Sequence, residues 1–308
     1  MWFKKLVGFD EINPEQVRKN IKIQDNKLIS LVNNQEYQFG ELEIVRKRVL
    51  ADRVKNFKSS KTSFTEIKAN VKDLHLDIKN ENALFQVTSQ FNLLEMINPD
   101  ITPEMGIDRY ENDFTQGPTC AIACGAGTIY RNYFVEVNGK IGQTKDNQIN
   151  CIDSVMKGFL DTDYIFKMKN GYLIIKDLER FNQVFSYIGE DLLKDNLKIG
   201  IMWNTEVTIS PNKHKVSQIY CSAFPISYNQ YFSNEVEKFA KLILEATYEA
   251  TICAGILNYI KTGNNKVFLT FVGGGVFGNK IEWIRDAIDK TLQNYQNSGL
   301  DIYLVHKK

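Results

Sequence analysis

The chain has 308 residues, 43% of them hydrophobic, which is enough for one large domain or two smaller ones. Its 38 lysines and arginines balance 37 aspartates and glutamates, and the resulting net charge of +1 argues against nucleic acid or a membrane surface as a partner. Five cysteines without a Cys-x-x-Cys pair indicate reduced thiols, so we expect a cytoplasmic location, with a nuclear one as the alternative. The sequence shows no apolar run of membrane-spanning length, no signal peptide and no metal-ligand spacing among its three histidines.

Residues 1–60 are predicted to form an accessory, β-rich segment. Pro14 suits the start of a short helix, and two strands are expected around a turn at Asp25-Asn26. Seven basic residues lie between positions 41 and 61. A solvated helix face is the usual explanation for such a run, and a local site for polyanions is the alternative.

From position 63 to 92 the pattern is that of two strands joined by a polar connection. The second strand ends in polar residues, which include Gln90 and Asn92. Because α/β folds bind ligands where their strands end, these two residues are candidates for ligand binding. The alternative is that they only close the strand into a loop.

A loop rich in Pro, Asp, Asn and Gly at 98–117 leads into a small-residue helix, TCAIACGAGTIYRN, which lacks bulk and can lie close to a sheet or a ligand. Glu111, Asp113 and Gln116 would lie at the amino-terminal end of this helix. Carboxylates gain there from the helix dipole, so Asp113 is either a capping residue or a ligand contact.

Residues 140–215 are less informative. Helix-like pieces are predicted at 148–159 and 177–195, and strands at 197–210 and 216–227. The longest helix is expected at Ser233–Lys261, where a broad apolar stripe suits a central packing helix.

The most informative stretch is VFLTFVGGGVFGN, from Val267 to Asn279. Its first residues predict a buried strand, and a helix at 281–295 and a strand at 300–306 follow. Strand, glycine loop, helix and strand form a βαβ unit, with the loop at the carboxyl edge of a parallel pair. Glycine lets a ligand approach the main chain, so the loop is predicted to bind an anion such as phosphate; a tight turn is the alternative.

Two familiar nucleotide motifs do not explain this loop. Gly273 to Gly278 fits G-x-G-x-x-G, but the following strand ends in Val305-His306 instead of the acid that a dinucleotide-binding fold requires. Asn279 stands where the loop of a nucleotide-triphosphate site has lysine.

These stretches resemble the macrodomain group, the ADP-ribose-binding α/β fold. TEIKANVKDLHLDIKNENALFQVTSQFN resembles its opening strands, and VFLTFVGGGVFGN resembles its second phosphate loop. The strings QFNLLE, TQGP-CAIA-GAGTIYRNYF and GGGVFGN also resemble an uncharacterised family nearly end to end. The resemblance implies an α/β domain at 61–308 with a macrodomain-like mixed sheet flanked by helices, preceded by the N-terminal segment and interrupted by an insertion at about 135–215.

The same resemblance assigns site residues by position. Asn70 stands at the adenine-contacting aspartate, and Asn92 stands near the distal ribose. The diphosphate loop corresponds to Gly273, Gly274, Gly275, Val276 and Phe277, with Asn279 just past it. The first ligand loop lacks the usual glycine run, and TQGP takes its place. The sequence also has no Gly-Gly-Gly followed by Gln-Glu-Glu, the signature of the poly(ADP-ribose) glycohydrolases, so ligand binding is better supported than hydrolysis.

We therefore predict a protein that binds ADP-ribose or a related NAD-derived nucleotide, free or on an ADP-ribosylated protein, without a cofactor or a metal. For hydrolysis of an ADP-ribosyl bond, Asn92 would orient the ribose, and Asp113 or Glu111 would activate water. Gln90 and Gln116 complete the predicted ligand contacts. The alternatives are a non-catalytic reader or sensor, and a structural or interaction protein on a macrodomain scaffold.

Overall fold

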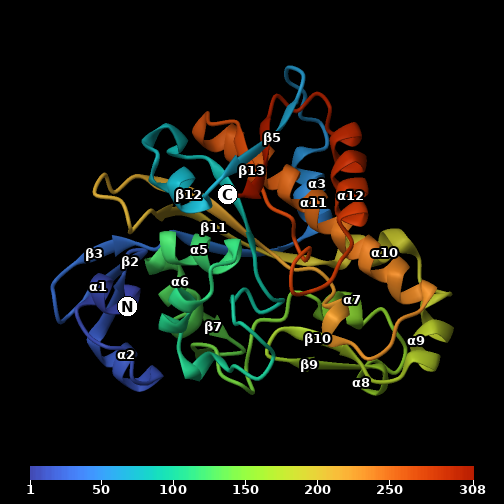
Figure 1. Cartoon of the computed structure of the whole chain (residues 1–308), viewed down its shortest axis with the longest axis horizontal. Coiled ribbons are helices and arrows are strands. Elements are labelled where there is room, and N and C mark those ends of the chain that lie inside the picture. Colours follow the sequence, from blue (N-terminus) through green and yellow to red (C-terminus); the bar gives the residue numbers. More distant parts are fainter.

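Seven strands form the central sheet in the computed structural model, which describes all residues from 1 to 308 (Figure 1). Their order across the sheet is β4 (Glu41–Arg46), β11 (Lys198–Glu206), β12 (Lys215–Cys221), β6 (Leu84–Thr88), β13 (Lys266–Leu269), β14 (Asp301–Lys307) and β5 (Ser63–Ala69). From β12 to β5 every pair is parallel, whereas β11 is antiparallel to both of its neighbours. The predicted fold class, α/β with a mixed sheet flanked by helices, is confirmed.

Helices cover both faces of this sheet (Figure 1). Because side chains alternate along a strand, Gln86 of β6 bonds to Thr251 of α11 (Asn234–Thr262), while the neighbouring Phe85 stacks on His75 of α4 (Val71–Leu76). The α11 side also carries α3 (Lys47–Val54) and α12 (Ile281–Asn294). The α4 side carries α5 (Gln116–Ala123) and α6 (Gly125–Tyr133).

The N-terminal residues and the middle of the chain are packed onto this framework. The N-terminal part contains α1 (Trp2–Val7), α2 (Pro14–Asn20) and the small sheet β1 (Ile21–Gln24), β2 (Lys27–Ser30) and β3 (Glu36–Gln38), and it also supplies β4. The middle contains β7 (Glu136–Val137), β8 (Lys140–Ile141), α7 (Asp153–Met156), α8 (Thr162–Ile165), β9 (Phe166–Lys169), β10 (Tyr172–Ile175), α9 (Leu178–Phe185) and α10 (Glu190–Asn196). A single hydrophobic cluster of 83 buried residues includes members of all these parts, so they share one core.

The predicted βαβ unit is confirmed, since β13, α12 and β14 follow one another and the two strands are parallel.

Three helix predictions need correction. The small-residue helix is two helices, broken at Cys124, whose backbone (φ −113°, ψ 56°) is not helical. The predicted helix at 148–159 shortens to α7, and the one at 177–195 divides at Gly189 into α9 and α10. None of the helices combines the length and hydrophobicity needed to cross a lipid bilayer.

Candidate ligand-binding cleft

A cleft of about 530 Å³ lies at the carboxyl ends of β6, β13 and β14. Ligands of α/β sheets bind at this edge, and a concave site of this size suits a small organic ligand. Its walls come from the loops after β6 and β13, the end of β14, the segment that leads into α5, the first turns of α12 and one residue of β10. The lining residues are Thr88, Ser89, Gln90, Glu95, Met96, Ile97, Asp113, Thr115, Gln116, Gly117, Pro118, Tyr172, Phe271, Gly273, Gly274, Gly275, Val276, Phe277, Ile281, Arg285, His306 and Lys307.

The glycine loop, residues 270–280 between β13 and α12, forms one wall of the cleft. Gly273 and Gly278 both have a φ of 75°, a conformation that favours glycine. The amides of Gly275, Val276 and Phe277 donate no hydrogen bond within the protein. Since these residues line the cleft just before the amino terminus of α12, their amides can receive an anionic ligand.

Asn279 lies behind this loop and outside the cleft lining. Its side chain is buried, and its amide nitrogen donates to the carbonyl oxygens of Phe224 (2.9 Å) and Gly273 (3.3 Å). The backbone amide of Asn279 also donates to the Gly273 carbonyl. The sequence predicts Asn279 as a ligand contact. In the structure, its hydrogen bonds hold the shape of the glycine loop.

The first loop, residues 89–97 after β6, also lines the cleft. Gln90 lines the cleft, and its side chain accepts from the Met96 amide (2.8 Å) and donates to the Met96 carbonyl (3.0 Å). Asn92 is fully buried and does not line the cleft. Its side chain donates to Gln148 and accepts from the Leu94 amide, so the structure places it in the support of the loop.

Asp113 and Gln116 both line the cleft, at the start of α5. One oxygen of Asp113 accepts from the Thr115 amide at 2.9 Å, which leaves the other oxygen for a ligand or water. The side-chain nitrogen of Gln116 donates to the Val305 carbonyl at 3.1 Å and links α5 to β14.

A second cleft of about 480 Å³ adjoins the first and contains the other two predicted residues, Asn70 and Glu111. Asp113, Gln116 and Lys307 line both clefts, so the two spaces are neighbours. The side chain of Asn70 caps α4 by accepting from the Lys72 amide. Glu111 pairs with the N-terminal ammonium group at 3.0 Å, and this contact lowers the pKa of its carboxyl.

Aromatic rings complete the first cleft. Tyr172 and Phe277 lie with their ring centroids 5.3 Å apart, and the Tyr172 hydroxyl donates to the Met96 carbonyl. Phe271 meets the His306 ring edge-on at 4.9 Å. Such faces suit the sugar or base of a nucleotide.

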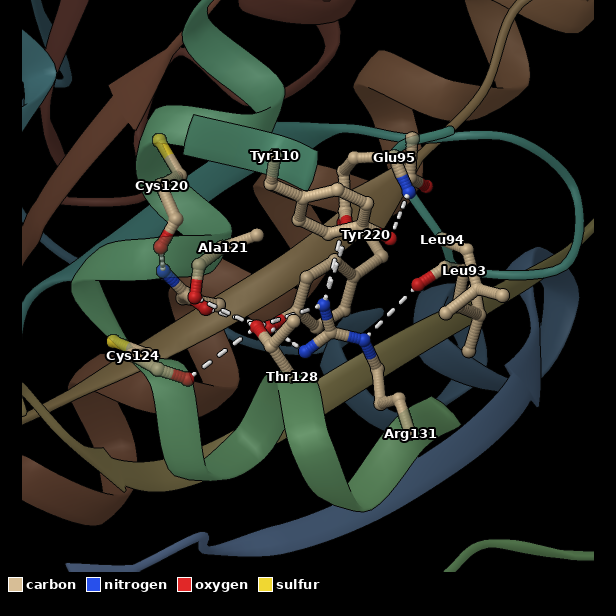
Figure 2. Close-up of polar contacts among 12 residues, drawn as sticks. Leu93, Leu94, Glu95, Tyr110, Cys120, Ala121, Cys124, Thr128, Arg131 and Tyr220 are labelled. Atoms are coloured by element: carbon tan, nitrogen blue, oxygen red, sulfur yellow. Dashed lines mark hydrogen bonds and ion pairs between the residues drawn. The ribbon is translucent and has the colours of Figure 1, made fainter. Parts of the chain in front are cut away.

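Glu95 is a cleft residue that was not predicted from the sequence. Its side chain is only 1% exposed and pairs with the fully buried Arg131 at 3.3 Å (Figure 2). Burial raises the pKa of the Glu95 carboxyl to about 7, against the opposing effects of Arg131 and Tyr110. The signal was present in the run NLLEM, because a carboxyl inside an apolar stretch has to be paired or protonated when it is buried. Finding its partner required the fold, since Arg131 lies 36 residues away in the sequence.

No protein-family model matches the sequence, and a search of curated proteins finds no match either. Among solved structures, the chain is similar to poly(ADP-ribose) glycohydrolases. The enzyme from Thermomonospora curvata bound to the inhibitor ADP-HPD has a TM-score of 0.45 and 9% identity, with 95% of this chain and 89% of that chain covered. The enzyme from Deinococcus radiodurans in complex with ADP-ribose has a TM-score of 0.46 and 8% identity, with 86% of each chain covered. Similarities this low do not establish the activity of this chain.

Proposed function

We propose that the cleft binds ADP-ribose or a related NAD-derived nucleotide. The observation that carries the proposal is the glycine loop, whose amides at Gly275, Val276 and Phe277 have no acceptor within the protein and border the cleft. A diphosphate brings several acceptor oxygens and negative charge, which is what an amide-rich loop before a helix favours.

Neighbouring surfaces can take the rest of the nucleotide. We assign the distal ribose to the floor beside Gln90 and Phe277, and the adenine to the second cleft beside Asn70. Asn70 offers an amide oxygen in place of a carboxylate, so its bond to the adenine amino group lacks charge assistance. Lys307 lines both clefts and offers its positive charge to the phosphates.

As the reaction, we propose hydrolysis of an ADP-ribosyl bond, with Asp113 activating the attacking water. Asp113 lines the first cleft and keeps one carboxyl oxygen free of protein contacts. Asn92 and Glu111, the other predicted catalytic residues, do not line this cleft. We assign Asn92 to holding the first loop and Glu111 to holding the N-terminus.

Isothermal calorimetry with ADP-ribose, AMP and NAD tests the binding. We expect micromolar affinity for ADP-ribose, reduced at least about tenfold by Gly275→Glu, because a carboxylate there repels the diphosphate. A side chain at Gly275 meets no atom within 4 Å, so the variant should fold. Gly189→Glu is the matched control, since a Cβ at Gly189 would contact only the Leu192 Cβ, at 4.0 Å, and Gly189 lies outside the cleft lining. Absence of binding to all three nucleotides would overturn the proposal.

Release of free ADP-ribose separates an enzyme from a reader. Incubation with poly(ADP-ribose) and with a protein that carries single ADP-ribosyl groups should yield ADP-ribose, and Asp113→Asn should abolish release while sparing affinity. Tight binding without release from either substrate indicates the non-catalytic reader. Equal loss of binding and turnover in Asp113→Asn would remove its catalytic role.

A further inference from the structure

Glu95 and Arg131 form a buried ion pair that belongs to a longer chain of polar side chains (Figure 2). The Arg131 Nε donates to the Leu93 carbonyl at 3.0 Å, and Nη1 donates to the Tyr220 hydroxyl. Nη2 lies 3.3 Å from the Thr128 hydroxyl and 3.3 and 3.4 Å from the two Glu95 oxygens. The guanidinium also lies over the Tyr220 ring, with its carbon 3.6 Å from the ring centroid.

The chain continues beyond Tyr220 into the core. The Tyr220 hydroxyl donates to the Gln218 side chain, whose nitrogen donates to the Cys120 carbonyl at 2.8 Å. Thus β12, α5 and α6 together fix the Arg131 guanidinium, and the guanidinium fixes the orientation of the Glu95 carboxyl.

The contact between Arg131 and Glu95 is long for an ion pair, because charge-assisted N–H···O bonds are usually about 2.7–2.9 Å. The attraction therefore does not outweigh desolvation, and the carboxyl keeps a pKa of about 7. The other titratable groups around it are Tyr110 of the 3-10 helix Asp108–Asn112, Cys120 of α5 and Tyr220 of β12. Burial raises the pKa of each of these three groups well above its usual value, so Arg131 is the charged neighbour at neutral pH.

Glu95 nevertheless borders the cleft, and Gly117 at the start of α5 is part of the reason. A Cβ at Gly117 would lie 2.2 Å from the Thr88 carbonyl oxygen and 3.6 Å from the Glu95 Cγ. Glycine therefore lets α5 approach the end of β6 closely, and Glu95 lies at this contact, in the lining of the cleft.

We propose that Glu95 is the proton-donating catalytic residue of the cleft, and that Arg131 and Tyr220 are positioning residues that hold its carboxyl there. This inference rests on the proposed hydrolysis of an ADP-ribosyl bond.

In the step, the protonated Glu95 donates its proton to the leaving atom attached to C1 of the distal ribose. The bond between C1 and that atom breaks, and its electron pair stays with the leaving group. Water attacks C1, a new C–O bond forms, and Asp113 accepts the water proton and passes it to solvent. The Glu95 carboxylate then regains a proton from solvent, so the net reaction consumes one water molecule.

The test is turnover and affinity of Glu95→Gln. We expect release of ADP-ribose to fall by about 10²–10⁴-fold, while affinity for ADP-ribose stays within about threefold of wild type. Glu136→Gln, the same change on an exposed strand residue outside the cleft, should leave both unchanged. In wild type, turnover should decline as pH rises above about 7, because the acid form of Glu95 is lost.

Tyr220→Phe tests the positioning role, since it keeps the ring under Arg131 but removes the hydroxyl. The freed Arg131 N–H can then turn to Glu95, so we expect slower turnover with unchanged affinity and a pH midpoint shifted to lower pH. A purely structural hydroxyl would lower the melting temperature and leave the midpoint in place.

The outcomes separate this inference from the proposed function. Lack of ADP-ribose binding by wild type contradicts the nucleotide site itself. Wild-type turnover in Glu95→Gln overturns the role of Glu95 alone. Binding without turnover in wild type also overturns it and leaves a reader.

Discussion

Two loops that line the cleft, the first loop and the glycine loop, are built in opposite ways. In the first loop, side chains bond to the backbone: Gln90 holds both polar groups of Met96, and Asn92 holds the Leu94 amide. The glycine loop contains four glycines, Gly273, Gly274, Gly275 and Gly278, and the amides of Gly275, Val276 and Phe277 have no acceptor within the protein. The first loop is thus a rigid support for a side chain, Glu95, whereas the second offers its backbone to a ligand.

The largest expected effect distinguishes two glycines of the same loop. Gly273→Ala should destabilise the protein by about 2–4 kcal/mol, because its φ is 75° and a Cβ would lie 2.4 Å from the Ala223 Cβ. Gly275→Ala, at an open position without positive φ, should change stability by less than about 0.5 kcal/mol. Urea unfolding measures both. Equal losses of stability in the two variants would mean that the backbone conformation of Gly273 does not determine the structure of the loop.

Glu95, in the first loop, should make the stability of the protein depend on pH. Its pKa is raised from 4.5 to about 7 in the folded protein, so between these values the native state keeps a proton that the unfolded chain loses. The contribution of this carboxyl to the free energy of unfolding is therefore fully present below pH 4.5 and is lost as pH rises through 7. The stability of wild type relative to Glu95→Gln should fall by about 1–3 kcal/mol over that range. A difference that stays flat with pH would contradict the raised pKa.

The side-chain support of the first loop can be removed with little change in volume. Gln90→Leu deletes both bonds to Met96 and should cost about 1–2 kcal/mol in urea unfolding. Of the side-chain bonds to the Met96 backbone, only the one from the Tyr172 hydroxyl would then remain. The loop should therefore loosen, and turnover should fall more than ADP-ribose affinity. Unchanged stability and turnover would show that Gln90 is not a support.

The smallest effect is expected at the rim. Arg285 pairs with Glu66 through two bonds of 2.7 and 3.0 Å, but both side chains are substantially exposed. Arg285→Ala should change stability by less than about 1 kcal/mol, and any loss of ADP-ribose affinity should shrink as salt is added. A large, salt-independent loss would place Arg285 in the binding site proper.

The glycine loop was the part of the site that the sequence predicted best. Its βαβ setting follows from a local alternation of apolar strand, glycines and amphipathic helix, all within 41 residues from 267 to 307. Local patterns of this kind determine elements directly. By contrast, Asn92 and Asn279 have the residue type of ligand contacts, but the structure gives their amides to backbone carbonyls, backbone amides and Gln148.

Glu95 shows what local patterns cannot supply. Its pKa depends on burial and on Arg131, which only the packing of α6 against the first loop brings near. The break between α5 and α6 has the same origin: Gly125 donates its amide to the Thr208 hydroxyl, and a Cβ there would lie 2.7 Å from the Trp2 ring. These contacts join residues far apart in the chain, so composition and spacing did not reveal them.

The central claim is that backbone amides of the glycine loop bind a nucleotide diphosphate, and the most direct measurement is a ¹H–¹⁵N NMR titration with ADP-ribose. The account predicts that the amide signals of Gly275, Val276 and Phe277 shift saturably, with the dissociation constant found by calorimetry. Those of Gly278 and Asn279, already bonded within the loop, should move less. Saturable binding that leaves the three free amides unmoved would contradict it.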